Sequence, residues 1–170
     1  MIVLDVARKA DIYSVAFSAD GAALVVCASG SRIGTAATWN ERIETVERDG
    51  IGAIAEAGMA RWFTARSRVE RPDLVHGFAT MLVRTPLAGY VDGCRAVRDA
   101  DLRAADARIR CRTLIVAGAE DAVTTPAMGG EMRDAIPNAE LVVLDGAAHM
   151  LCAEQPAATN AALLRFLEGR

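Results

Sequence analysis

Two short apolar segments near the end of the chain constrain its fold more than any other feature. They read Thr113-Leu-Ile-Val-Ala-Gly-Ala-Glu-Asp121 and Leu141-Val-Val-Leu-Asp-Gly-Ala-Ala-His149. Each begins with a β-branched run that predicts a buried strand, and each ends in small residues followed by Asp121 or His149. Chemistry in parallel α/β sheets gathers at the carboxyl ends of the strands. We therefore expect Asp121 and His149 to meet as a candidate acid and base.

The elements around these two segments alternate between strand and helix. Alternation at these lengths implies parallel strands that are joined by right-handed crossovers, which is an α/β fold. An earlier pair of apolar runs is separated by Ser18-Ala-Asp-Gly21, which has the chemistry of a hairpin turn. The predicted strands cover residues 12–17, 22–28, 113–117 and 141–144, and the predicted helices cover residues 1–9, 126–136 and 156–167.

A helical block interrupts this alternation from Thr38 to about Ala107. Its apolar residues recur at helical spacing, and breaks at Asp49-Gly50, Arg71-Pro72 and Thr85-Pro86 divide it into about four helices. A helical block between two strands is typical of a lid or cap. The expected organisation is a remnant of the core at 1–30, a helical cap at 31–108 and a carboxy-terminal core at 109–170.

Composition limits the partners that this protein can have. The chain has 170 residues, of which 52% are hydrophobic and 24% charged, so it is long enough for a real core. Its net charge of -3 is mixed along the sequence and includes no basic stripe, which argues against nucleic acid. No apolar run reaches the ~18 residues of a membrane span. Four widely spaced cysteines without a C-x-x-C pair predict buried free thiols, and we expect a cytoplasmic protein.

Asp121 and His149 each have an ordinary structural alternative. A lone aspartate in a loop is more often a helix N-cap or a turn residue. A loop histidine often has no chemical task, and His76 in the helical block is interpreted in that way. The spacing favours the catalytic hypothesis, because an acid after one strand and a histidine after the next are what a catalytic triad needs.

Several further segments carry a resemblance to a known family. Gly118-Ala-Glu-Asp121, Gly146-Ala-Ala-His149 and Glu154-Gln155-Pro156 resemble the carboxy-terminal half of α/β-hydrolases. The expected cap is similar to that of 3-oxoadipate enol-lactonases in the segments Ser31-Arg-Ile-Gly-Thr35, Trp39-Asn40, Arg61-Trp-Phe-Thr64, Thr85-Pro-Leu-Ala-Gly-Tyr90 and Cys94-Arg-Ala-Val-Arg-Asp-Ala-Asp-Leu-Arg103. The similarity extends from about Leu24 to Leu167.

This resemblance implies hydrolysis of a small enol-lactone that carries a carboxylate, without a metal or an organic cofactor. A serine would attack the lactone carbonyl, His149 would take and return its proton, and Asp121 would orient the imidazole. The carboxylate of the substrate needs a cationic or donating wall. Our candidates are Arg32 and Trp39, followed by Arg98 and Trp62, with core packing and solvated surface charge as the alternatives.

The resemblance also predicts that the nucleophile is absent. Met1-Ile-Val-Leu-Asp-Val-Ala matches the helix that follows the G-x-S-x-G elbow, so the expected fold is an α/β-hydrolase truncated at its amino terminus. Ser29 and Ser31 lack the flanking glycines of that elbow. Three alternatives remain: a catalytically silent remnant, a binding module that keeps the cap and its pocket, and an esterase of other specificity. An exposed sheet edge would favour self-association.

Overall fold

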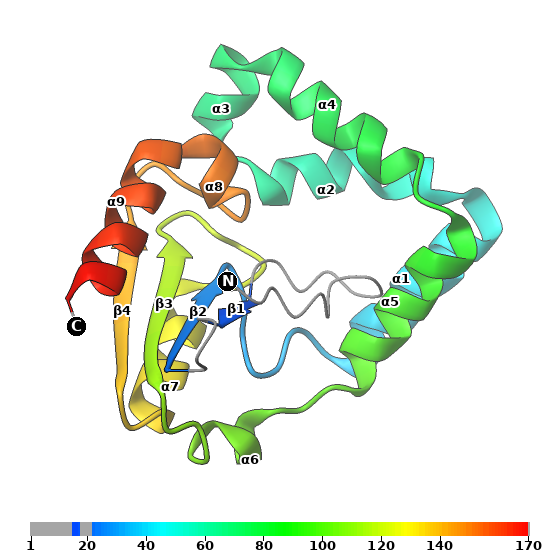
Figure 1. The fold of residues 1–170 in the computed structure, drawn as a ribbon. Coiled ribbons are helices and arrows are strands. Elements are labelled where there is room, and N and C mark those ends of the chain that lie inside the picture. The colour runs from blue at the N-terminus through cyan, green and yellow to red at the C-terminus, as the bar shows by residue number, and fades with distance from the viewer. Residues whose placement is uncertain (1–14, 18–21, 170) are drawn as a thin grey trace.

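The computed structural model describes residues 15–17 and 22–169 of the chain. Within these ranges four strands form one mixed sheet (Figure 1), in the order β1 (Val15–Phe17), β2 (Ala23–Cys27), β3 (Arg112–Gly118) and β4 (Ala139–Leu144). β1 pairs antiparallel with β2, whereas β2, β3 and β4 run parallel. The predicted α/β class is confirmed. The helix expected at 1–9 and the turn expected at 18–21 lie outside the described residues.

Helices cover both faces of the sheet in its carboxy-terminal part (Figure 1). They are α7 (Pro126–Ala135), α8 (Leu151–Glu154) and α9 (Pro156–Glu168). Successive residues of a strand point to opposite faces. Val25 accordingly lies in an apolar cluster with Phe166 of α9, and Val26 lies in another with Met132 of α7. Full burial of one such side chain contributes about 1.5–3 kcal/mol, so β2 is held from both sides.

The predicted cap lies between β2 and β3 and arches away from the sheet (Figure 1). Its helices are α1 (Ala36–Asp49), η2 (Ile51–Ile54), α2 (Ala55–Trp62), α3 (Ala65–Glu70), α4 (Pro72–Val83), α5 (Leu87–Asp99) and α6 (Arg103–Asp106). All three predicted breaks fall between helices, but the block is divided more finely than the four helices expected. The additional break after α2 has a local cause, because the hydroxyl of Thr64 accepts a hydrogen bond from the N–H of Ser67 and caps α3.

The cap has its own hydrophobic core. Trp39 and Ile43 of α1 are buried there with Val97 of α5 and Trp62 of α2. Met150 belongs to the same cluster, although it lies in the loop between β4 and α8. The residue that follows His149 is therefore packed into the cap, which ties the cap to the carboxyl ends of the strands.

Gly118, the last residue of β3, permits a close approach between two loops. A Cβ atom at this position would overlap the backbone carbonyl oxygens of Ala147 and Ala148. Backbone hydrogen bonds join the same regions, because the N–H of Ala119 donates to Leu144 and that of Glu120 donates to Ala147. Only glycine leaves room for the loop that carries His149 to lie directly against the end of β3.

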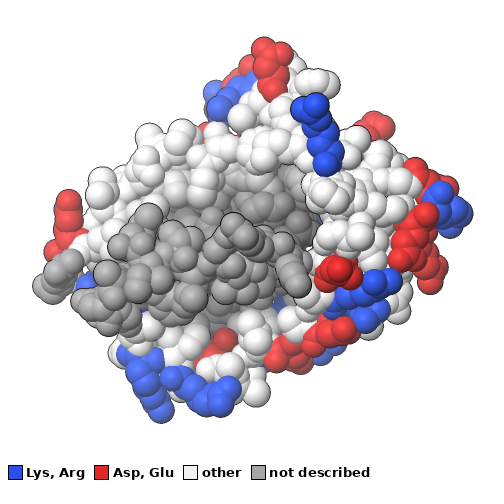
Figure 2. Space-filling view, turned by 45° about the vertical axis from the view of Figure 1, so that its right-hand side comes forward, with Lys and Arg blue, Asp and Glu red and all other residues white. Residues whose placement is uncertain are grey.

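Charged side chains of both signs mix over the outer surface of the cap (Figure 2). Arg95 pairs with Glu47 at 3.2 Å, an ion pair that joins α5 to α1. Over the described ranges, no helix is long and apolar enough to cross a membrane. Among the described residues β4 is an edge strand, and its Val143 is 42% exposed. Self-association through a sheet edge stays a prediction.

Candidate active site

Asp121 lies in the loop directly after β3, and both oxygens of its carboxylate accept hydrogen bonds. One carboxylate oxygen, Oδ1, accepts hydrogen bonds from the backbone N–H groups of Val123 at 2.7 Å and Thr124 at 2.9 Å. The other oxygen, Oδ2, accepts a hydrogen bond from the Thr124 hydroxyl at 2.7 Å. Through Oδ1, Asp121 stabilises the turn that follows β3, as a loop aspartate often does. Its Oδ2 faces the second polar residue of the site.

That second residue is His149. Its Nδ1 atom lies 2.9 Å from Oδ2 of Asp121, and both side chains are almost completely buried. A carboxylate without a proton can only accept, so Nδ1 carries the hydrogen of this bond. The hydroxyl of Thr124 lies 3.2 Å from the same nitrogen and fixes the ring further. Nε2 is then the ring nitrogen that can act as a base.

The surroundings of Asp121 favour its charged form. Burial on its own would raise the pKa of Asp121, but the hydrogen bond and charge of His149, together with the donors of Thr124, hold that pKa below the ordinary value of 3.8. Asp121 is therefore an anion at neutral pH. A fixed anion beside Nδ1 stabilises an imidazolium when Nε2 takes a proton, which is the role of the acid in a catalytic triad.

His149 lines a cavity of about 200 Å³ between the strand ends and the cap. Both tryptophans predicted for the substrate site, Trp39 and Trp62, lie in its wall. The other described residues that line the cavity are Ile33, Gly34, Thr38, Arg42, Gly58, Arg61, Val97 and Val123. The cavity wall thus combines one histidine, two tryptophans, two arginines and apolar residues.

The two arginines predicted for this wall lie elsewhere. Arg32 pairs with Asp101 at 3.0 Å and lines a separate cavity of about 300 Å³. Arg98 donates to Asp99 at 2.8 Å and to Asn40 at 2.9 Å on the outer side of the cap. Acidic or amide partners beside each arginine hold these side chains away from His149, so the structure does not bring them to the candidate site.

Arg42 and Arg61, which were not among the expected substrate-binding residues, line the cavity instead. Arg42 follows Trp39 by three residues on α1, and Arg61 directly precedes Trp62 on α2. Residues three apart lie on the same face of a helix, so the expectation that Trp39 lines the site could have been extended to Arg42. Its guanidinium lies 5.3 Å from the centre of the Trp39 ring and donates to the Tyr90 hydroxyl at 3.3 Å.

No serine is among the described residues that line this cavity. The hydroxyl of Ser31 donates to Asp106 at 2.5 Å, and that of Ser67 is bonded to Thr64 at 3.1 Å. In the part of the chain that the structure describes, no group of three or more His, Cys, Asp or Glu residues could hold a metal ion.

A sheet of this topology, with an acid and a histidine after successive parallel strands and a cap over them, is the arrangement of an α/β-hydrolase. The chain belongs to the α/β-hydrolase family, whose family model matches residues 3–162. Among characterised proteins, it is 34% identical over 140 residues to 3-oxoadipate enol-lactonase 2 of Acinetobacter baylyi. That match covers 82% of this chain and 52% of the relative.

Solved structures agree with this assignment. The enol-lactonase of Burkholderia xenovorans is 32% identical with a TM-score of 0.83, over 86% of this chain and 56% of that one. A thermophilic esterase of Thermogutta terrifontis, at 24% identity and a TM-score of 0.80 over 87% of this chain and 56% of that one, shares the fold. The chain spans about half the length of the curated relatives that it matches.

Proposed function

We propose that this site serves the hydrolysis of a small lactone that carries a carboxylate, as the names of the enol-lactonase relatives suggest. The observation that carries the proposal is the hydrogen bond between His149 and Asp121 at the wall of a cavity that also holds Arg42 and Arg61. The imidazole supplies a base, and the two guanidinium groups supply a site for an anion.

In the proposed reaction, Nε2 of His149 takes the proton of a serine hydroxyl while the serine oxygen attacks the lactone carbonyl. The ring C–O bond then breaks, and His149 returns the proton to the departing enol oxygen. Water hydrolyses the acyl-enzyme by the same route in reverse. Asp121 stabilises the imidazolium formed in each half, and two backbone N–H groups hold the oxyanion. The serine and these N–H groups are supplied from outside the described residues.

Arg42 and Arg61 are the proposed partners of the substrate carboxylate. A carboxylate that leaves water needs charged donors, and a charge-assisted hydrogen bond is worth about 1.5–3 kcal/mol. Arg42 is half-buried beside Trp39, which favours a desolvated contact with the ligand. Trp39 and Trp62 would enclose the apolar part of the ring.

The test compares this chain with a chimera in which the amino-terminal half of the Acinetobacter baylyi enol-lactonase precedes it. Each is incubated with 3-oxoadipate enol-lactone and with a neutral aryl ester. We expect the chimera to hydrolyse the lactone with a higher kcat/KM than the aryl ester. A folded chimera that prefers the ester would support the esterase alternative and contradict the lactonase proposal.

A binding module without catalysis is the second candidate function, and it is favoured by one observation: the described residues that line the cavity include no serine. Calorimetric titration of the chain with the dicarboxylate product distinguishes the two candidates. Binding by the chain, together with a folded chimera that has no turnover, would favour the module. Turnover by the chimera that depends on His149 would favour the hydrolase.

A further inference from the structure

Glu154 is a buried carboxylate that bonds to two different parts of the molecule. It is the last residue of α8, and only 7% of it is exposed. Its Oε1 atom accepts hydrogen bonds from the backbone N–H and the hydroxyl of Thr64, both at 2.9 Å. Its Oε2 atom accepts from the backbone N–H of Ala148 at 2.7 Å. One side chain therefore joins the cap, at Thr64, to the residue that precedes His149.

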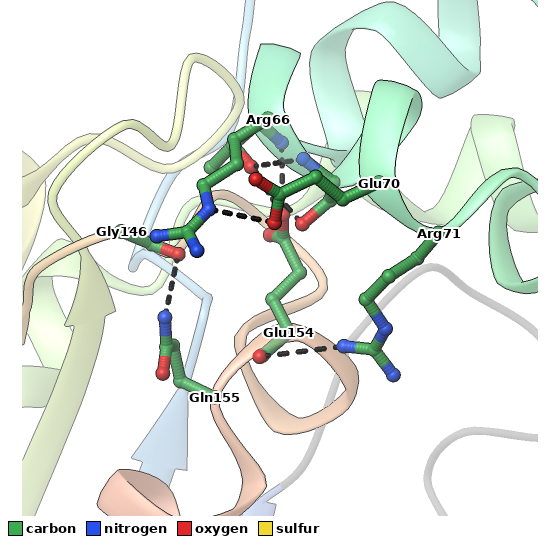
Figure 3. A network of polar contacts seen from close by, with 8 residues as sticks. Arg66, Glu70, Arg71, Gly146, Glu154 and Gln155 are labelled. Carbon is green, nitrogen blue, oxygen red and sulfur yellow. Dashed lines mark hydrogen bonds and ion pairs between the residues drawn. The ribbon is translucent and has the colours of Figure 1, made fainter.

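A carboxylate is the side chain that this arrangement requires. Both of its oxygens face backbone N–H groups, which can only donate. Glutamine would turn its NH₂ group toward one of these donors and leave it unsatisfied. No ion pair within the described ranges includes Glu154; the nearby guanidinium of Arg71 donates to the backbone oxygen of Ala153 and to that of Glu154 (Figure 3). Burial of an unpaired carboxylate is costly, so its bonds at both ends have to compensate for that cost.

The residue on the other side of His149 is also bonded to the cap. The N–H of Met150 donates to the backbone oxygen of Trp62 at 2.9 Å, and the Met150 side chain is buried in the cap core. His149 thus lies between two neighbours that are both held by the cap, Ala148 through Glu154 and Met150 through Trp62. Trp62 itself lines the cavity with His149.

We propose that Glu154 is a positioning residue that couples the cap to His149. Through its bonds to Thr64 and Ala148, Glu154 makes the position of the His149 imidazole depend on how the cap packs against the histidine loop. Glu154 is not among the residues that line the cavity, and it acts through the backbone on either side of the histidine. The catalytic meaning of this coupling rests on the proposed function, whereas the coupling itself does not.

Side-chain NMR of the intact chain tests the coupling without any turnover. The sequence holds two histidines and two tryptophans, so the imidazole and indole signals are few. His76, exposed on α4, is an internal reference. We expect Glu154→Gln to shift or broaden the imidazole signals of His149 and the indole signal of Trp62, while the signals of His76 stay in place.

Variants on the cap side keep the proposal falsifiable if Glu154→Gln does not fold. Thr64→Val removes the hydroxyl that donates to Oε1, and it should move the His149 signals in the same direction as Glu154→Gln does. Thr64→Ser keeps a hydroxyl, and its His149 signals should match those of the parent chain. Gln155→Ala is the matched control, because Gln155 holds the same loop through the oxygen of Gly146 at 3.0 Å without any bond to the cap (Figure 3).

Two results would overturn the proposal. One is a Thr64→Val variant whose His149 signals match those of the parent chain. The other is a Glu154→Gln variant that moves these signals no more than Gln155→Ala does. These signals do not depend on catalysis, so a lack of hydrolysis in the chimera would count against the proposed function alone.

Discussion

The Oδ2 atom of Asp121 lies 2.9 Å from Nδ1 of His149, although 28 residues separate them in the chain. Asp121 follows β3 and His149 follows β4, two neighbouring parallel strands, so the topology of the sheet brings the pair together. Thr124 bonds to both side chains and holds the carboxylate and the ring in one orientation.

Asp121 should make the stability of the chain depend on pH. Its pKa in the folded protein lies below the ordinary value of 3.8, so its contribution to stability is fully present above that pH and is lost as the pH falls through the folded-state pKa. Asp121→Asn removes this titration. Urea unfolding should show that the gap in free energy between parent and variant shrinks on acidification below about pH 4. A gap that widens there would contradict this assignment.

Gly118→Ala should destabilise the protein, because the new methyl group overlaps the carbonyl oxygens of Ala147 and Ala148. Overpacking of this kind costs about 1–3 kcal/mol. The matched control is Gly130→Ala in α7, where a Cβ atom meets nothing within 4 Å and helix propensity predicts a gain of up to about 1 kcal/mol. Denaturant unfolding measures both. Equal effects of the two substitutions would mean that the close approach at Gly118 is unimportant.

Arg42→Met should weaken the binding of a carboxylate ligand by about tenfold to a hundredfold, the worth of one charge-assisted hydrogen bond. Methionine keeps an apolar stem against Trp39 and removes only the charged head. Arg98→Met removes an arginine of the same cap that is not among the residues lining the cavity, so binding should stay unchanged. Calorimetric titration with the dicarboxylate product measures the dissociation constants of both variants. Equal losses of affinity would mean that the overall charge of the cap, and not a contact with Arg42, determines binding.

Cys152 should be the most reactive thiol near neutral pH. A hydrogen bond from the Cys27 thiol lowers the pKa of Cys152 to about 7, although partial burial opposes this. Cys152 is exposed and Cys111 is half-buried, whereas Cys27 and Cys94 are buried, so the expectation of buried cysteines holds only for Cys27 and Cys94. Its alkylation by iodoacetamide should be half-maximal near pH 7, and Cys27→Ala should move that midpoint upward. Peptide mass spectrometry follows each site, and an unmoved midpoint would exclude a role for Cys27.

The sheet and the meeting of Asp121 with His149 could be predicted from the sequence, because both depend on local patterns. A β-branched run that ends in small residues determines the strand, and parallel order determines which polar groups share an edge. The break before α3 was missed because it depends on one threonine, Thr64, whose capping role has no signature in the apolar spacing.

Only part of the cavity wall could be predicted in the same way, because Trp39 and Trp62 were expected there and Arg42 and Arg61 were not. Which face of a cap helix meets the strand ends depends on how α1 and α2 pack, and this packing selects Arg42 and Arg61. Arg32 lies close to the same junction in sequence, but Asp101, which is distant in the chain, pairs with it. The part of Glu154 in joining the cap to the histidine loop likewise depends on a tertiary contact with Thr64, 90 residues away.

The most direct test of the central claim is the hydrolysis of 3-oxoadipate enol-lactone by the chimera and by its Asp121→Asn variant. Asparagine keeps the shape of the side chain but loses the charge that stabilises the imidazolium. We predict that kcat/KM falls by roughly 10³- to 10⁴-fold while the melting curve remains cooperative. A folded variant that retains activity within a few-fold of the parent chimera would show that Asp121 is not the acid that supports His149 in this site.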